Sequence, residues 1–168
     1  MNKLDKLDLD IINELRSDAR TSIQEISKKL DRRRATIHAR INKLEEKKII
    51  KGYTIIPDFG KLGHAITVFV LVSVSEKQYK KSDTDNELSQ KIAEIPQVSE
   101  IHSVSGEFDY LLKIRVDNLE TLGKEILFNL RKQYGAVRTL TLTAFYTGKE
   151  ELGNEYLQFL NSEYSKLL

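Results

Sequence analysis

Cysteine and tryptophan are missing from this chain of 168 residues, which also has only two prolines and three histidines. The lack of cysteine excludes disulfides, thiolate zinc sites and a cysteine nucleophile. No apolar run approaches the roughly 20 residues that a helix needs to cross a bilayer, so we expect no contact with a membrane. Residues 1–6 lack the apolar segment of a secretory signal, and we therefore expect a cytoplasmic protein.

Catalytic motifs are missing as well. The histidines His38, His64 and His102 lie far apart in the sequence, and none pairs with an acidic residue at the spacing of one helix face. The chain has no glycine-rich phosphate loop, no HExxH and no GxSxG pattern. We therefore expect no enzyme, no metal site and no cofactor, and we expect His102 to be a packed or surface residue.

The charges that are present are unevenly distributed. Residues 1–52 contain 14 Lys and Arg against 9 Asp and Glu, whereas residues 53–168 contain 13 against 16. Residues 28–51 alone hold ten cations and three anions. A local excess of this size is typical of a surface that binds a polyanion, although a charge run taken alone fits a solvated helix face equally well.

Three short helices are predicted in the basic part of the chain. Residues 4–17 have apolar side chains at helical spacing, and Asp5 is placed to cap their first turn. Ser22 and Glu25 form the Ser-x-x-Glu pattern of a capping box, which starts a second helix of about two turns. A third helix is predicted after residue 34 because its apolar residues, Ile37, Ile41 and Leu44, recur at the i, i+4 and i+7 positions.

The rest of the sequence predicts an α+β domain. Residues 49–56 have the β-branched and aromatic composition of two short strands or a wing, and the next residues contain two glycines, as a linker does. Strand and helix patterns then alternate in the order β-α-β-β-α-β, which is the ferredoxin-like arrangement. A final apolar stripe predicts an extra C-terminal helix. The expected divisions are residues 1–57 for a winged helix-turn-helix, 58–64 for the linker, 65–147 for the ferredoxin-like domain and 148–168 for the last helix.

The three-helix unit has the properties of a helix-turn-helix that reads DNA. The major groove admits one helix, whose N-terminal residues reach the base edges. Arginine can form two hydrogen bonds with guanine, whereas lysine neutralises phosphate as a point charge. We expect base contacts from Arg33, Arg34, Thr36, His38 and Arg40, and phosphate contacts from Arg32, Lys43 and Lys51.

Five segments, in order and at the proper intervals, resemble the leucine-responsive/asparagine-type (Lrp/AsnC) transcription regulators, also called feast/famine regulators. The resemblance covers about residues 4–147. Members of that family usually have Gly-Leu-Ser before the recognition helix where this chain has Asp31-Arg32-Arg33, and Asp tolerates left-handed geometry better than most residues. The segments are Leu4-Asp5-x-x-Asp8-x-x-Ile11-Ile12-x-x-Leu15, Asp18-x-Arg20-x-Ser22-x-x-Glu25-Ile26-Ser27, Arg40-Ile41-x-x-Leu44-Glu45, Ile50-x-Gly52-Tyr53 and Val104-Ser105-Gly106-Glu107-Phe108-Asp109-Tyr110-Leu111-Leu112.

The resemblance implies a sequence-specific regulator that binds double-stranded DNA as a homodimer or a multiple of dimers. It also implies a small effector, usually an amino acid, near the loop formed by Gly106, Glu107, Phe108 and Asp109. A glycine-containing loop can present backbone N–H groups to a carboxylate, although an ordinary hairpin turn has the same sequence. Two other functions remain open: a stand-alone effector-binding or metabolic module with a ferredoxin-like core, and an architectural protein that coats DNA.

Overall fold

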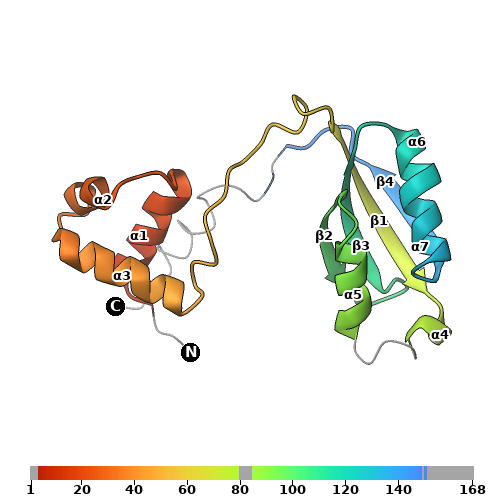
Figure 1. Cartoon of the computed structure of the whole chain (residues 1–168), viewed down its shortest axis with the longest axis horizontal. Coiled ribbons are helices and arrows are strands. Elements are labelled where there is room, and N and C mark those ends of the chain that lie inside the picture. The colour runs from red at the N-terminus through yellow and green to blue at the C-terminus, as the bar shows by residue number, and fades with distance from the viewer. Residues whose placement is uncertain (1–3, 80–84, 149, 151–168) are drawn as a thin grey trace. The chain divides into compact units, whose positions relative to one another are not determined.

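The computed structural model describes residues 4–79, 85–148 and 150. The chain divides into two compact units, which comprise residues 4–56 and 57–148 of this described part (Figure 1). Apart from positions 148 and 150, the helix predicted for residues 148–168 lies outside the described residues. No helix among the described residues is long and apolar enough to cross a membrane.

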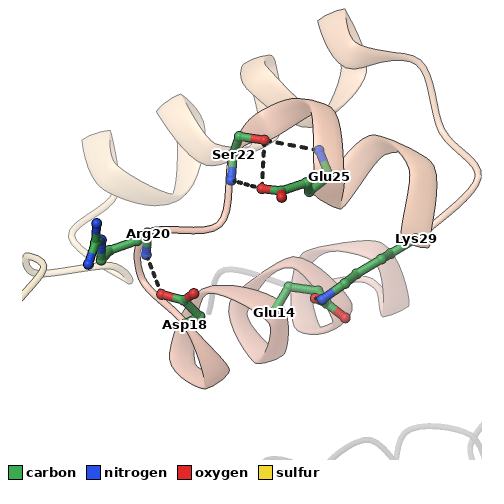
Figure 2. Close-up of polar contacts among 6 residues, drawn as sticks. All are labelled: Glu14, Asp18, Arg20, Ser22, Glu25 and Lys29. Carbon is green, nitrogen blue, oxygen red and sulfur yellow. Dashed lines mark hydrogen bonds and ion pairs between the residues drawn. The ribbon is translucent and has the colours of Figure 1, made fainter.

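The first unit consists of helices α1 (Lys6–Ser17), α2 (Ile23–Lys29) and α3 (Arg34–Glu46). Asp5 caps α1 and Ser22 caps α2, as the sequence predicts. Both caps are reciprocal capping boxes, which the sequence analysis predicted only for Ser22. Lys29 Nζ lies 2.6 Å from Glu14 Oε2, and this ion pair joins the end of α2 to α1 (Figure 2). The capping contacts between Ser22 and Glu25 lie beside it in the same view.

A small apolar core holds the three helices together. Ile11 of α1 and Ile26 of α2 are fully buried against the inner face of α3. That face is formed by Ile37, Ile41 and Leu44, the residues that the helical spacing selects. The burial of one face of α3 leaves its opposite face to solvent.

The segment after α3 does not form the strands expected for residues 49–56. These residues are all described, and none of them belongs to a strand. Ile49 and Ile50 donate their backbone N–H groups to Leu44 O, which closes the end of α3, and the chain then runs on without ladder hydrogen bonds. A strand needs a neighbouring strand for its backbone groups, and the local composition of this segment cannot supply one.

The second unit contains a four-stranded antiparallel sheet. Its strands are β1 (Ile66–Val74), β2 (Val98–Ser103), β3 (Tyr110–Val116) and β4 (Ala136–Thr143), in the spatial order β2-β3-β1-β4. β1 and β3 are therefore central, which agrees with the apolar residues on both faces of β1. The α+β fold class predicted from the sequence, with its ferredoxin-like order, is confirmed.

Helices cover one face of this sheet. They are α5 (Asp85–Ala93) and a continuous helical stretch made of α6 (Leu119–Thr121), the π-helical turn η1 (Leu122–Leu127) and α7 (Phe128–Lys132). A further short helix, α4 (Glu76–Tyr79), follows β1. The core between sheet and helices includes Leu88 and Ile92 from α5 and Leu122, Ile126 and Leu130 from the second stretch.

The opposite face of the sheet carries apolar side chains that no described helix covers. Residues directly opposite each other in a ladder share a face, and Phe69 pairs with Leu142 while Leu71 pairs with both Leu140 and Leu111. Leu140 and Leu142 are 46% and 50% exposed. We call these five residues the open sheet face.

The predicted linker forms a compact turn in the second unit. Leu62 and His64 donate backbone N–H groups to Asp58 O and Phe59 O. The guanidinium of Arg115, on β3, lies 4.1 Å from the centre of the Phe59 ring. These contacts fix the turn against the sheet.

Candidate nucleic-acid interface and effector loop

The turn between α2 and α3 adopts the left-handed geometry that a glycine would favour, but it does so at Asp31. The φ angle of Asp31 is 49°, a conformation that Asp tolerates better than most residues. Arg32 N donates to Ser27 O, and Ser27 Oγ donates to Arg32 O at 2.6 Å. Ser27 thus closes the turn from both sides and sets the angle at which α3 starts.

The first turn of α3 has an unusual charge for a helix. Its N-cap is Arg33, which forms no side-chain cap, and none of the residues in that turn, all of them described, is acidic. Arginines at a helix N-terminus oppose the positive end of the helix dipole, where anions are favoured. A polyanion such as the DNA backbone would offset this repulsion, because it interacts favourably with both the arginines and the helix end.

Most of the predicted DNA-contacting residues are exposed on or beside α3. Arg33, Arg34, Thr36, His38 and Lys43 lie along the helix surface, whose opposite face is buried. Arg32 is exposed in the preceding turn, with its Nη1 donating to Asp31 O at 2.9 Å. Lys51 is exposed in the segment after α3. The structure therefore gathers seven of the eight expected residues at exposed positions in and around one helix.

Sequence reasoning missed the residues at the centre of the exposed face of α3. With 3.6 residues per turn, the position opposite the buried Ile37, Ile41 and Leu44 is occupied by Ala35, Ala39 and Asn42, all exposed. Asn can form two hydrogen bonds with adenine, and an alanine methyl can contact the methyl group of thymine. Counting positions around the helix from its buried face would have identified Ala35, Ala39 and Asn42, whereas a search for charged residues could not.

Arg40 is placed differently from the other expected residues. Its Nη1 lies 2.6 Å from Asp5 Oδ2 and 2.9 Å from Asp8 Oδ1. These are the two carboxylates of the α1 capping box, and Asp8 is buried. The guanidinium therefore joins α3 to the N-terminus of α1, and this geometry favours a positioning role over the base contact expected from the sequence.

The charges of this cluster reinforce one another. The hydrogen bonds from Arg40 to Asp5 and Asp8 raise the pKa of the Arg40 guanidinium above its usual value. Partial burial of Asp5 favours its neutral form, but the hydrogen bonds from the Asp8 backbone and from Arg40 outweigh that effect and lower the pKa of Asp5. The Asp5 carboxylate and the Arg40 guanidinium, which together join α1 to α3, are thus both charged at neutral pH.

The end of α3 is joined to the segment that follows it by Tyr53. Its hydroxyl donates to Glu45 Oε1 at 2.8 Å. Burial and this hydrogen bond to a carboxylate raise the pKa of Tyr53 to about 12. Tyr53 is thus a neutral donor at physiological pH, and it holds the segment after α3 against the helix.

The expected effector loop, residues 106–109, is hydrogen-bonded to the C-terminal end of β1. Asp109 Oδ2 accepts from Val74 N at 2.8 Å, and Asp109 N donates to Val72 O. Ser73 Oγ donates to Glu107 O at 2.9 Å. Gly106 has a φ of 114°, which other residues rarely adopt. Asp109 therefore holds the loop in shape, and its carboxylate is already engaged.

Charges of both signs lie beside an aromatic ring in this loop. Glu107 Oε2 is 3.4 Å from Nη1 of Arg138, at the start of β4. The Arg138 guanidinium lies 4.9 Å from the centre of the Phe108 ring. The sequence reasoning missed Arg138 because it is 31 residues away from Glu107, and only the pairing of β1 with β4 brings it to the loop.

Among the described residues, no group of three His, Cys, Asp or Glu side chains is arranged to hold a metal ion. His102 is exposed, with its Nε2 3.5 Å from Glu100 Oε2 on the same strand. This agrees with the surface position considered for His102 from its sequence.

Two family models match the chain. A winged helix-turn-helix DNA-binding domain matches residues 4–51, and the Lrp/AsnC ligand-binding domain matches residues 67–152. The matched ranges contain the exposed face of α3 and the loop with Glu107, respectively.

Curated relatives and a solved structure extend the match. The chain is 40% identical to an uncharacterized HTH-type transcriptional regulator of Pyrococcus horikoshii over 89% of this chain and 97% of that protein. It is 36% identical to the leucine-responsive regulatory protein of Klebsiella pneumoniae over 72% of each. A feast or famine regulatory protein of M. tuberculosis, solved with L-methionine, has the same fold, with a TM-score of 0.79 at 23% identity over 89% of this chain and 97% of that one.

Proposed function

The chain belongs to the Lrp/AsnC family of transcription regulators, and we propose that it recognises a specific DNA sequence through α3. The observation that carries this proposal is the exposed face of α3, with arginines at the positive end of its dipole. Arg33 and Arg34 meet base edges at the N-terminus of the helix, followed by Thr36 and His38. Arg32, Lys43 and Lys51 contact phosphates, and Arg40 keeps α3 in position on α1.

The regulator acts as a dimer, or a multiple of dimers, formed through the open sheet face. Contiguous exposed apolar side chains are typical of a surface that another protein covers. We infer that this protein is a second copy of the same chain, because the resemblance to the family implies a homodimer. Two copies then present two α3 helices to half-sites that are separated by about one helical turn of DNA, ~34 Å, or a multiple of it.

The effector is an α-amino acid bound at the loop of residues 106–109. A free amino acid carries an ammonium and a carboxylate, and Glu107 and Arg138 offer the two opposite charges 3.4 Å apart. The ligand would separate this ion pair, with its ammonium at Glu107 and its carboxylate at Arg138 and at the backbone around Gly106. Phe108 provides an apolar wall for the ligand's side chain. A transcription regulator binds chromosomal DNA, and the expected location is the cytoplasm.

Selection from a pool of random DNA duplexes tests the proposal. The purified chain is incubated with the pool at physiological salt, and bound duplexes are sequenced. Enrichment of a pseudo-palindromic sequence supports a specific regulator. Binding without enrichment indicates a DNA-coating protein, and absence of binding indicates a stand-alone effector module. Each of these two results overturns the proposal. A screen of the twenty amino acids by thermal shift then identifies the effector, because a ligand of the folded state raises the melting temperature.

Arg34→Ala gives the sharpest single-residue test. If Arg34 forms two hydrogen bonds with guanine, its loss should weaken binding to the selected sequence by about 1–3 kcal/mol and relax the preference at one base pair. Lys43→Ala is the matched control, because the loss of a phosphate contact should weaken binding to all sequences and reduce the salt dependence. Equal loss of affinity for every sequence in the Arg34 variant would show a phosphate contact instead.

A further inference from the structure

An apolar groove of about 520 Å³ lies on the first unit. One wall is α1, and the other is the segment that follows α3. Exposed apolar side chains line its rim: Tyr53 is 49% and Ile56 is 62% exposed. The apolar residues of its lining include Leu9, Ile12, Leu15, Ile50, Tyr53 and Ile56.

The wall formed by the segment after α3 is held in place. Tyr53 donates a hydrogen bond to Glu45 Oε1, and the backbone of Ile49 and Ile50 is bonded to the end of α3. The groove is therefore a fixed feature of the unit. Exposure of such an apolar surface to water is unfavourable in free energy, so the groove favours a partner with apolar side chains.

The C-terminal segment of this same chain has the chemistry that fits the groove. Residues 151–168 lie outside the described part, but their sequence places Leu152, Tyr156, Phe159 and Leu160 at the i, i+4, i+7 and i+8 positions of a helix. Most of the stability of a helix in a protein comes from the packing of its amphipathic face, so such a stripe needs a surface on which to be buried.

Charge and length favour the same occupant. Residues 151–168 contain three Glu and one Lys, a net charge of −2, whereas the charged residues that line the groove, Arg16 and Lys51, are both cations. The ligand-binding family model ends at residue 152. The Pyrococcus horikoshii relative is matched over 97% of its length but only 89% of this chain. The segment is thus largely an addition of this chain to the shared domains.

We propose that residues 151–168 dock as an amphipathic helix in the groove between α1 and the segment after α3. Tyr156 and Phe159 occupy the groove, and the glutamates of the segment lie on the side of Arg16, which leaves Lys51 for its phosphate. Arg33, Arg34, Thr36 and His38 are not among the described residues that line the groove, so docking leaves the DNA-reading face of α3 free.

A single tryptophan tests the docking, since the chain has none of its own. Ile56→Trp places a reporter at the groove in the full-length chain. Its emission should shift to longer wavelength, and its quenching by acrylamide should increase, when Tyr156→Ser and Phe159→Ser are added. Gln24→Trp, at an exposed position of α2 that does not line the groove, is the control and should show neither change.

A second measurement avoids any change in the groove itself. In the chain with Tyr156→Ser and Phe159→Ser alone, hydrogen exchange should become faster in residues 49–56 and in α1, and remain unchanged in β1. Phe159→Leu should retain the slow exchange. Identical emission and identical exchange with intact and substituted segments would overturn the proposal and assign the groove to another partner.

Discussion

At the scale of single residues, Arg40 shows how position in the sequence and position in space differ. Arg40 belongs to α3, the helix that is predicted from the basic composition to bind DNA, and other cationic residues belong to the same helix. Its guanidinium nevertheless contacts Asp5 and Asp8, which lie 35 and 32 residues earlier in the chain. A carboxylate pair of this kind competes with a DNA phosphate for the same donor.

We expect Arg40→Gln to weaken DNA binding without changing its salt dependence. The substitution removes the tie between α1 and α3 and leaves the buried Asp8 without its cation, which should lower the free energy of unfolding by about 1–3 kcal/mol. No phosphate contact is lost, so the slope of log affinity against log salt should be unchanged. Asp8→Asn should have a similar effect, and the double variant should cost less than the sum of the two. A reduced slope with unchanged stability would instead place Arg40 on the DNA.

The lowered pKa of Asp5 makes the stability of the first unit depend on pH. The Asp5 carboxylate is stabilised in the folded chain, so its contribution is fully present above its unfolded pKa of about 4 and is lost as pH falls through the lower, folded value. Asp5→Asn should therefore be less stable than the parent at pH 7, and the difference should shrink below about pH 4. Denaturant titrations between pH 7 and pH 3 measure this, and parallel profiles for the two proteins would contradict it.

At the scale of elements, local signals predicted the helices well. The capping boxes at Asp5 and Ser22 involve residues three positions apart, so the sequence contains both partners of each contact. The buried face of α3 also follows from spacing alone. Residues 49–56 were expected to form two short strands or a wing, and no strand forms there, because strand pairing depends on a neighbour that the segment itself does not encode. The π-helical turn η1 was not anticipated either, since its backbone hydrogen bonds leave no clear signal in side-chain spacing.

We expect Ser22→Ala to destabilise the first unit by about 1 kcal/mol, because the change removes the side-chain acceptor for the Glu25 N–H group at the start of α2. Chemical denaturation followed by circular dichroism should show the lower midpoint. Ser22→Asp restores an acceptor and should retain most of the stability. If the alanine and aspartate variants unfold at the same midpoint as the parent, the capping box does not contribute measurably.

At the scale of the whole molecule, the fold class and the order of the strands were predicted from the sequence, because apolar alternation and turn residues repeat regularly along residues 65–145. The group of side chains at the loop of residues 106–109 was predicted only in part. Glu107 and Phe108 belong to a contiguous motif, whereas Arg138 reaches them through the ladder between β1 and β4. Contacts between distant segments depend on the register of the sheet, which the pattern of single strands does not determine.

The open sheet face gives a prediction about assembly. Leu140→Arg places a charge among its apolar side chains without touching the core on the helix side. We expect this variant to remain folded, to sediment as a single protomer and to bind operator DNA much more weakly. Phe128→Arg puts the same charge on the helix side of the unit, where Phe128 is 54% exposed, and should leave the assembly unchanged. A Leu140 variant that still sediments as the parent does would place the contact between copies elsewhere.

The position of Arg138 on β4 has a consequence for control. Arg138 and Leu140 are two residues apart on the same side of the same strand, with side chains opposite Ser73 and Leu71. In the dimer and at the effector site proposed above, a ligand that draws Arg138 away from Glu107 would act on the strand that also contacts the second copy. Free-energy linkage then requires reciprocity: if occupancy of the loop tightens or loosens self-association, self-association changes the affinity for the ligand by the same factor. Under the proposed function, binding of the effector would therefore change the number of subunits that act together.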